Sequence, residues 1–299
     1  MTARMHDGQL SVDEELAGEL IAREFPALAG APVTAVPGSG TVNAIFRVGD
    51  TVAARFPLAV ISRKELDSEA SALAEFAAAC PFAAPVPLGI GSAHERYPSA
   101  WTLQSWVSGE AADPFSAADS DEFAADLGAL LLALRAVPAG DREFDGRGRG
   151  GVLHDHDEWM THCLTRSEGL VDVVGAARAW RRLRDTPQAG AHVMSHRDLT
   201  PSNLLVQAGR LTGVLDGGGF GPADRSLDLV CAWHLLSAGP RRRLREIVSA
   251  SDDEWRRGAA WALQQAMGLV WYYETSNPVM TELGRSTVAR VLDDPDLRG

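Results

Sequence analysis

Lysine is almost absent from this sequence: Lys64 is the only one, and arginine supplies nearly all of the basic charge. The 28 basic residues are outnumbered by 40 acidic residues, which gives a formal net charge of −12. A surface that binds nucleic acid has to be basic, because it neutralises backbone phosphates. The charge balance therefore argues against nucleic acid as a partner.

Cysteines and long apolar runs are also scarce. Cys80, Cys163 and Cys231 are odd in number and far apart, so they indicate neither a disulfide framework nor a paired-thiol zinc site. The longest apolar stretch, residues 123–134, contains Asp126 and is shorter than the roughly 20 residues that cross a bilayer. The first ten residues are polar and carry no apolar signal region. We expect a cytoplasmic protein without membrane partners, as a monomer or homodimer.

The most informative stretch is residues 194–206, in which positions 196–203 read H-R-D-L-T-P-S-N. This has the H-R-D-L-x-x-x-N form of a kinase catalytic loop, and Asp216 stands where the metal-binding aspartate follows. Asp198 can orient a hydroxyl and accept its proton, while Asn203 and Asp216 offer the hard oxygen atoms that Mg²⁺ prefers. The alternative is that both aspartates are ordinary turn residues, but three matched positions at the right spacing favour phosphoryl transfer.

The residues between Asn203 and Asp216 support this interpretation. Two short apolar runs, 204–206 and 211–215, flank a turn that contains Gly209. Such a pattern predicts a β-hairpin. The hairpin would bring Asn203 beside Asp216.

Residues 196–203 resemble the catalytic brace of the aminoglycoside (antibiotic) phosphotransferase family, a branch of the protein-kinase-like fold. Arg197 and Thr200 replace the family's usual Gly and His, and glycines rather than an aromatic residue follow Asp216. The resemblance extends to residues 221–229, where Asp228 takes the place of a buried aspartate that braces the catalytic loop.

The resemblance implies an α+β, two-lobed protein-kinase-like fold. Residues 1–107 would form a small antiparallel β-sheet lobe that binds the nucleotide. Residues 108–299 would form a larger, mainly helical lobe for catalysis and substrate binding. The nucleotide would be ATP or GTP, bound with Mg²⁺ in the cleft.

The small lobe is also visible in the pattern of the sequence. Alternating apolar positions predict five strands, and helical spacing predicts two helices. The expected strands cover residues 32–36, 44–48, 51–56, 85–91 and 101–107, and the expected helices cover 12–25 and 62–79. Gly38, Ser39 and Gly40 resemble a kinase glycine loop and are candidate nucleotide contacts, although glycines at a hairpin tip are often plain turn residues.

Arg55 is the expected phosphate-binding cation. Residues 52–55 read V-A-A-R and parallel the V-A-I-K motif, while Lys64 lies outside any such strand. A guanidinium can donate two parallel hydrogen bonds to phosphate oxygens. Glu69 in the following helix is the expected ion-pair partner of Arg55, Glu65 is the alternative, and a solvated helix face is the bland interpretation of Glu69. At the interlobe hinge, the resemblance implies that backbone groups of four residues bind the nucleobase: Gln104, Ser105, Trp106 and Val107.

The larger lobe should be helical at residues 119–135, 229–236, 241–249 and 252–274, with a loop at 138–157. In that loop, residues 147–151 read R-G-R-G-G, which suits an anion site but is more typical of a mobile surface loop. The segment 154–163 holds histidines and carboxylates, yet it lacks the spacing of zinc motifs and favours surface or capping roles.

The acceptor is the hardest feature to predict. The tentative substrate residues are Asp224, Trp271, Tyr272 and Glu274, although aromatic residues at helical spacing are usually core. With these carboxylates and the acidic 155–158 cluster nearby, a cationic hydroxylated acceptor such as an aminoglycoside-like antibiotic is expected. The alternatives are a kinase of an endogenous amino alcohol or sugar, and a nucleotide-binding regulator without transferase activity, for which decayed catalytic residues would be needed.

Overall fold

The computed structural model describes residues 9–36, 42–113, 115–146 and 148–297. Gly38, Ser39 and Gly40, the expected glycine loop, lie outside these ranges. The chain forms two compact units: Met1–Ala78 with Ala83–Ser108 and Asp216–Gly218, and Ala79–Phe82 with Gly109–Leu215 and Gly219–Gly299. The contiguous division at residues 107 and 108 stays a prediction, since the three residues from Asp216 belong to the first unit.

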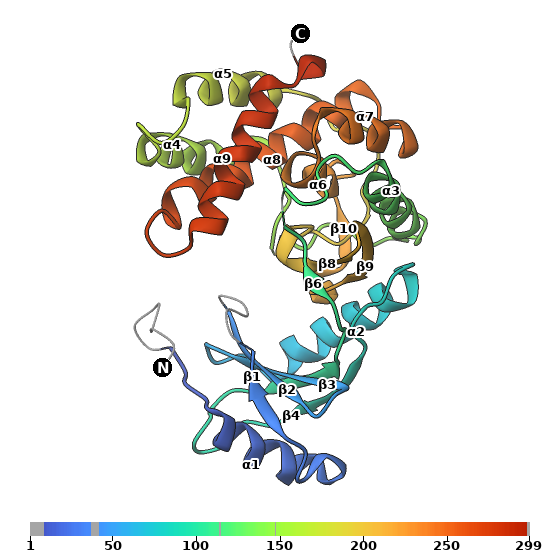
Figure 1. Ribbon diagram of the computed structural model, residues 1–299, viewed down its shortest axis with the longest axis vertical. Coiled ribbons are helices and arrows are strands. Elements are labelled where there is room, and N and C mark those ends of the chain that lie inside the picture. The colour runs from blue at the N-terminus through green and yellow to red at the C-terminus, as the bar shows by residue number, and fades with distance from the viewer. Residues whose placement is uncertain (1–8, 37–41, 114, 147, 298–299) are drawn as a thin grey trace. The chain divides into compact units, whose positions relative to one another are not determined.

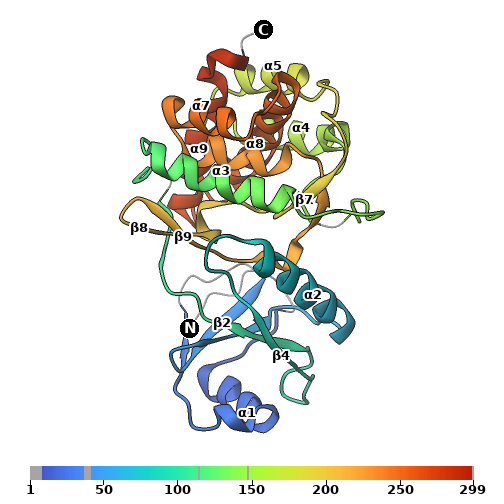
Figure 2. The same ribbon diagram turned by 90° about the vertical axis from the view of Figure 1, so that its right-hand side faces the viewer.

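The first unit is built on a five-stranded antiparallel sheet with the order β1-β2-β3-β5-β4. Helices α1 and α2 lie on opposite faces of this sheet (Figure 1, Figure 2). The elements are α1 (Glu14–Glu24), β1 (Val33–Ala35), β2 (Asn43–Val48), β3 (Val52–Pro57), α2 (Arg63–Ala79), β4 (Pro87–Gly91) and β5 (Trp101–Ser105). All five strands and both helices occur within a few residues of the predicted positions.

The alternation of side chains along β3 positions the site. Phe56 and Ala54 are fully buried in the core beneath α1, where Phe56 stacks on Trp101 with a centroid separation of 4.8 Å. Successive strand residues point to opposite faces. Arg55 therefore projects from the other face of the sheet, on which α2 lies.

The second unit is mainly helical. Its helices are α3 (Asp121–Arg135), α4 (Asp157–Arg166), α5 (Val173–Leu183), α6 (Val230–Leu235), α7 (Ala238–Ile247), α8 (Asp252–Tyr272) and α9 (Pro278–Asp293). Two small sheets accompany them, one with β6 (Glu110–Ala111), β8 (Leu204–Gln207) and β9 (Arg210–Val214), the other with β7 (Val193–Ser195) and β10 (Gly221–Ala223). Helices α4, α5 and α9 and the β7–β10 pair were not predicted from the sequence.

Helix α8 runs through the core of the second unit, beside α9 (Figure 1). Trp255 and Trp261 are each 1% exposed, so these aromatic residues at helical spacing are core residues, as the pattern indicated. Among the described residues, no helix is long and apolar enough to cross a membrane. The α+β fold class, with a small antiparallel sheet lobe and a larger helical lobe, is confirmed.

Candidate active site

Arg55 and Asp216 form an ion pair within the first unit. Nη2 of Arg55 lies 2.8 Å from Oδ1 of Asp216, and the two side chains are 17% and 43% exposed. Asp216 adopts a left-handed backbone conformation with φ 62°, which aspartate tolerates better than most residues. The strand cation and the expected metal ligand are therefore brought together, although 161 residues separate them in the chain.

Asp216 is the carboxylate that lies within ion-pair distance of Arg55, and pairing of Arg55 with Glu69 stays a prediction. Glu69 keeps much of its surface exposed; partial desolvation raises the pKa of its carboxyl, and the nearby charge of Arg55 acts in the opposite direction. The alternative, Glu65, accepts hydrogen bonds from the backbone N–H and the hydroxyl of Ser62 at 3.0 and 2.7 Å. Glu65 therefore caps the start of α2.

A glycine at position 217 is required by the packing of α2. A Cβ atom there would lie 2.2 Å from the ring of Phe76, which is fully buried. The aromatic ring on this side of Asp216 thus comes from α2. This packing accounts for the glycine that follows Asp216, the expected metal ligand.

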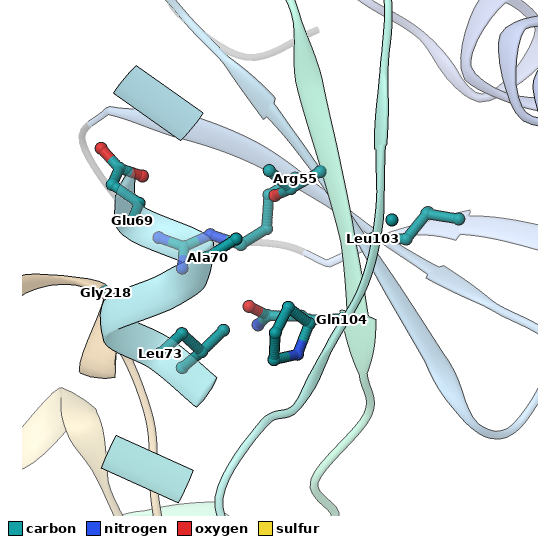
Figure 3. Close-up of a pocket in the computed structure, with 10 residues that line it drawn as sticks. Arg55, Glu69, Ala70, Leu73, Leu103, Gln104 and Gly218 are labelled. Carbon is teal, nitrogen blue, oxygen red and sulfur yellow. The ribbon is translucent and has the colours of Figure 1, made fainter. Parts of the chain in front are cut away.

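A small cavity in the first unit lies beside Arg55 (Figure 3). Its lining includes Arg55, Glu69, Leu103, Gln104 and Gly218. Its volume of about 20 Å³ is roughly the space of one water molecule. As it stands, the cavity is too small for a nucleobase.

The strand end that was expected to bind the nucleobase already uses some of its donors. The N–H groups of Ser105 and Trp106 donate to the carbonyls of Val86 and Thr51, both at 2.8 Å. These two N–H groups therefore cannot also donate to a nucleobase. The other backbone groups of the expected hinge residues are left to bind it. Binding by Gln104, Ser105, Trp106 and Val107 stays a prediction, with these two N–H groups removed from the candidates.

In the second unit, Asp198 and Asn203 are held together directly. The amide Nδ2 of Asn203 donates to the main-chain oxygen of Asp198 at 2.9 Å and to its Oδ2 at 3.1 Å. The predicted hairpin is confirmed as β8 and β9, and the N–H of Leu215 donates to the carbonyl of Asn203 at 2.7 Å. Leu215, the residue before Asp216, is therefore held beside Asn203.

Asp228 braces the catalytic loop, as the resemblance implied. Its two carboxylate oxygens accept the backbone N–H groups of His196 and Arg197 at 2.8 and 2.9 Å. Arg197 has φ 71°, a left-handed conformation that explains why glycine is usual there. In this chain the buried Arg197 side chain contacts Asp145 at 3.0 Å and the carbonyl of Pro222 at 2.8 Å. These contacts offset the backbone strain.

Each of the two expected metal ligands offers a hard oxygen atom within its own unit. Because Nδ2 of Asn203 faces Asp198, its side-chain carbonyl Oδ1 is left to act as a ligand. Asp216 supplies an anionic, partly exposed carboxylate. Neutral and anionic oxygens of this kind are typical Mg²⁺ ligands.

Sequence reasoning missed a cation that contacts Asp198. Nη2 of Arg149 lies 3.1 Å from Oδ1 of Asp198, within the second unit. Arg149 belongs to the R-G-R-G-G segment, for which a mobile surface loop was the favoured interpretation. The contact with Asp198 shows that the Arg149 guanidinium can meet an anionic group, which the anion-site alternative had allowed.

Asp224 is not placed to bind a substrate. It is 2% exposed, pairs with Arg257, and accepts hydrogen bonds from the N–H and hydroxyl of Ser226 at 2.9 and 2.7 Å. Burial opposes its ionisation, but the Arg257 and Ser226 contacts outweigh burial and hold the pKa of Asp224 below its ordinary value. The tentative substrate role of Asp224 is therefore corrected to a structural one.

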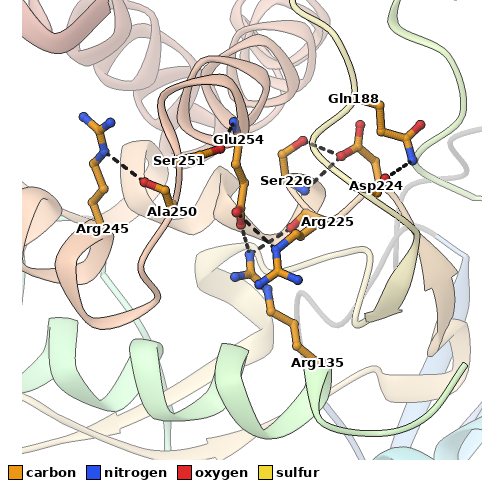
Figure 4. Close-up of polar contacts among 10 residues, drawn as sticks. Arg135, Gln188, Asp224, Arg225, Ser226, Arg245, Ala250, Ser251 and Glu254 are labelled. Carbon is orange, nitrogen blue, oxygen red and sulfur yellow. Dashed lines mark hydrogen bonds and ion pairs between the residues drawn. The ribbon is translucent and has the colours of Figure 1, made fainter.

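A second buried ion pair lies close to this one in the fold (Figure 4). Arg135 and Glu254, 6% and 4% exposed, are 2.8 Å apart, and Arg225 approaches Glu254 at 3.1 Å. Together with Asp224, these residues tie α3 and α8 to the segment that follows β10. That segment leads to Asp228, so the network supports the catalytic loop.

The other tentative substrate residues differ in exposure. The ring N–H of Trp271 donates to Sγ of Cys163 at 3.3 Å, and the Arg166 guanidinium lies 5.1 Å from the Trp271 ring centroid. Tyr272 is 48% exposed and Glu274 is exposed. Trp271 is thus partly engaged in packing, while Tyr272 and Glu274 remain accessible to a ligand.

The histidine- and carboxylate-rich segment does not form a metal centre. His154 contacts Asp185 at 3.1 Å, while Asp157 pairs with Arg184 and accepts the ring N–H of Trp180 at 2.7 Å. Across the ranges that the structure describes, no three His, Cys, Asp or Glu side chains gather as a metal site.

Replacing Asp224 by alanine is expected to destabilise the protein, because it leaves the buried Arg257 charge without a partner. Breaking such a pair costs about 3–5 kcal/mol. The exposed Glu274→Ala variant is the matched control and should change the free energy of unfolding little. Chemical denaturation measures both; equal stabilities would contradict the buried role of Asp224.

The same pair has a defined pH dependence. Because the pKa of Asp224 is lower in the folded protein, its contribution to stability is present above the unfolded value, about 3.9. That contribution is lost as the pH falls toward the folded pKa. The stability difference between wild type and Asp224→Ala should therefore shrink in acid.

The fold and the catalytic-loop geometry define a two-lobed, kinase-like phosphotransferase class. The model of the phosphotransferase enzyme family matches residues 33–261. The chain therefore belongs to this family. An aminoglycoside 3'-phosphotransferase of Escherichia coli is 28% identical over 125 residues, which are 37% of this chain and 42% of that protein. The chain thus spans less than half the length of this curated relative.

Solved structures show the same fold at low sequence identity. A GDP complex of aminoglycoside 2'-phosphotransferase-IIIa superposes with a TM-score of 0.68 at 16% identity, covering 94% of this chain and 99% of that chain. A macrolide 2'-phosphotransferase from Brachybacterium faecium gives 0.60 at 17% identity, covering 92% and 97%.

Proposed function

We propose that the protein is an ATP- or GTP-dependent O-phosphotransferase that transfers the γ-phosphate to a hydroxyl of a small molecule. The observation that carries this proposal is the locked pair of Asp198 and Asn203, in a loop whose two backbone N–H groups are held by Asp228. A positioned carboxylate of this kind orients a hydroxyl and accepts its proton.

The other residues act by charge and position. Arg55 donates to phosphate oxygens of the nucleotide, which requires its guanidinium to share or exchange the Asp216 contact. Asp216 and Asn203 would hold Mg²⁺, and the ion would neutralise charge on the nucleotide phosphates. The residues Gly38, Ser39 and Gly40 are proposed to cover the phosphates.

The proposed acceptor is an antibiotic with a reactive hydroxyl, an aminoglycoside-like compound in the first instance. Related structures include a kanamycin complex and a gentamicin complex of aminoglycoside 2"-phosphotransferases. Others are macrolide 2'-phosphotransferases. Family membership and these relatives support the antibiotic class; a kinase of an endogenous amino alcohol or sugar remains the alternative.

The electrostatic argument for a cationic acceptor loses part of its basis in the structure. Asp224 and Asp157 are both paired with arginines, and Asp198 itself lies against Arg149. The exposed carboxylates of Glu274, Asp155 and Glu158 are left to contribute negative potential. Support for a cationic acceptor therefore comes from the relatives.

The test is a screen of purified protein with ATP or GTP and Mg²⁺ against aminoglycosides, macrolides, amino alcohols and sugars, with phosphate transfer followed by mass. An 80 Da increase on an antibiotic supports the proposal. Transfer confined to amino alcohols or sugars would move the assignment to a metabolite kinase. Nucleotide binding without any transfer would leave a regulator. For a cationic acceptor, KM should rise with ionic strength, because salt screens exposed charges.

Arg55→Ala is expected to raise the nucleotide KM and to lower kcat, because the strand cation that meets the phosphates is lost. Arg55→Lys should restore part of the activity, since it keeps the charge but loses the paired donors. The matched control is Lys64→Ala, which removes an exposed cation from α2 in the same unit. Steady-state kinetics with varied nucleotide concentration measure both variants. A loss of activity in Lys64→Ala but not in Arg55→Ala would contradict the role of Arg55.

A further inference from the structure

Arg149 contacts the catalytic carboxylate in a way that the proposed function leaves unused. Its Nη2 lies 3.1 Å from Oδ1 of Asp198, while its Nη1 donates to Oε1 of Gln265 on α8. The other oxygen of Asp198 accepts from Asn203. The carboxylate thus has a guanidinium on one oxygen and a neutral amide on the other, and all four residues belong to the second unit.

Gln265 is a built anchor for this arginine. It is only 8% exposed, and its Nε2 has no hydrogen-bond partner among the described residues. Its Oε1 also lies 3.5 Å from Nε2 of His234. Burial, together with the charge of Arg149, lowers the pKa of His234 to about 3, so this ring is neutral. A buried amide with an unmet donor is costly, and its oxygen is committed to Arg149.

Glycines with positive φ flank Arg149, whose side chain is partly exposed. Gly148, Gly150 and Gly151 have φ values of 68°, 128° and 90°, so glycines in left-handed conformations flank the arginine. The Arg149 side chain is 39% exposed. The guanidinium therefore lies at the edge of the core, where a ligand can reach it.

We propose that Arg149 is a further catalytic residue, which binds the transferred phosphoryl group, and that Gln265 is its positioning residue. This inference rests on the proposed phosphotransferase function. The fork of a guanidinium has five donors, so it can contact the Asp198 carboxylate and a phosphoryl oxygen together.

The proposed reaction brings negative charge close to Asp198. The acceptor hydroxyl gives its proton to Asp198, and its oxygen forms the new bond to the γ-phosphorus. The bond from that phosphorus to the bridging oxygen breaks, and the departing nucleoside diphosphate keeps the electron pair. The phosphoryl group thus reaches an oxygen within hydrogen-bond distance of Asp198. A guanidinium beside the same carboxylate stabilises the charge on the equatorial oxygens.

The experiment compares transfer kinetics of purified variants with the acceptor found in the screen. Arg149→Ala should lower kcat by about 10²-fold, a conservative figure for a transition-state arginine. The nucleotide KM should stay within about threefold. Arg149→Lys, or guanidinium ion added to Arg149→Ala, should restore part of kcat, which a merely structural arginine would not show. Arg182→Ala, which removes an exposed arginine of α5, is the matched control and should behave as wild type.

Gln265→Leu separates positioning from folding. It should lower kcat by roughly tenfold, with the nucleotide KM unchanged. An unchanged kcat in Arg149→Ala would overturn the inference. So would a loss of kcat that neither lysine nor guanidinium ion restores and that comes with a lower midpoint of thermal unfolding. A wild-type protein without transferase activity would instead overturn the proposed function.

Discussion

Asp198→Asn is expected to lower kcat by about 10²–10⁴-fold, the scale for a positioned acid or base, with nucleotide affinity near that of wild type. An amide retains the shape of the carboxylate but cannot take the acceptor proton. Asn203 keeps its second anchor, because its Nδ2 also donates to the main-chain oxygen of Asp198 at 2.9 Å. The metal-binding side of Asn203 should therefore survive the substitution.

The measurement pairs single-turnover transfer with a nucleotide titration. Glu168→Gln is the matched control, since it neutralises an exposed carboxylate of the same unit. Asp198→Asn activity within a few-fold of wild type would remove Asp198 from the mechanism. A parallel loss of nucleotide binding would show that the substitution disturbs the loop rather than the chemistry.

The parts of the site that could be predicted are those written in short stretches of sequence. Residues 196–203 fix Asp198 and Asn203 by spacing alone, and the apolar runs around Gly209 fix the hairpin that follows. Alternation along β3 also fixes which face carries Arg55. In each case the relevant contacts lie within a few residues or one strand pair, where periodicity is informative.

Partners far apart in the chain could not be chosen in this way. Helical spacing made Glu69 a reasonable partner for Arg55, but it says nothing about Asp216, which lies 161 residues further on. From the sequence, Asp224 was expected to be an accessible carboxylate, but in the fold it is buried against Arg257. Arg149 sits among glycines without any periodic pattern, so only the folded loop reveals its contact with Asp198.

Asp216→Ala is expected to abolish the Mg²⁺ dependence of nucleotide binding, because the anionic member of the proposed ligand pair is lost. Removing one member of a close charge pair costs about 2–5 kcal/mol, so affinity in Mg²⁺ should fall by roughly 30-fold or more. Asn203→Ala should weaken binding less, since it removes a neutral ligand.

The Arg55–Asp216 pair adds a second, opposite effect that sharpens the test. Without Asp216, the Arg55 guanidinium no longer divides its donors between a carboxylate and the nucleotide phosphates. Affinity measured in a chelator should therefore equal or exceed that of wild type, while affinity in Mg²⁺ falls. Titrations of nucleotide into wild type, Asp216→Ala and Asn203→Ala, each with and without Mg²⁺, give the metal dependence of all three proteins. Equal metal dependence in wild type and Asp216→Ala would exclude Asp216 as a metal ligand. A loss in chelator as large as the loss in Mg²⁺ would mean instead that Asp216 acts by holding Arg55 in place.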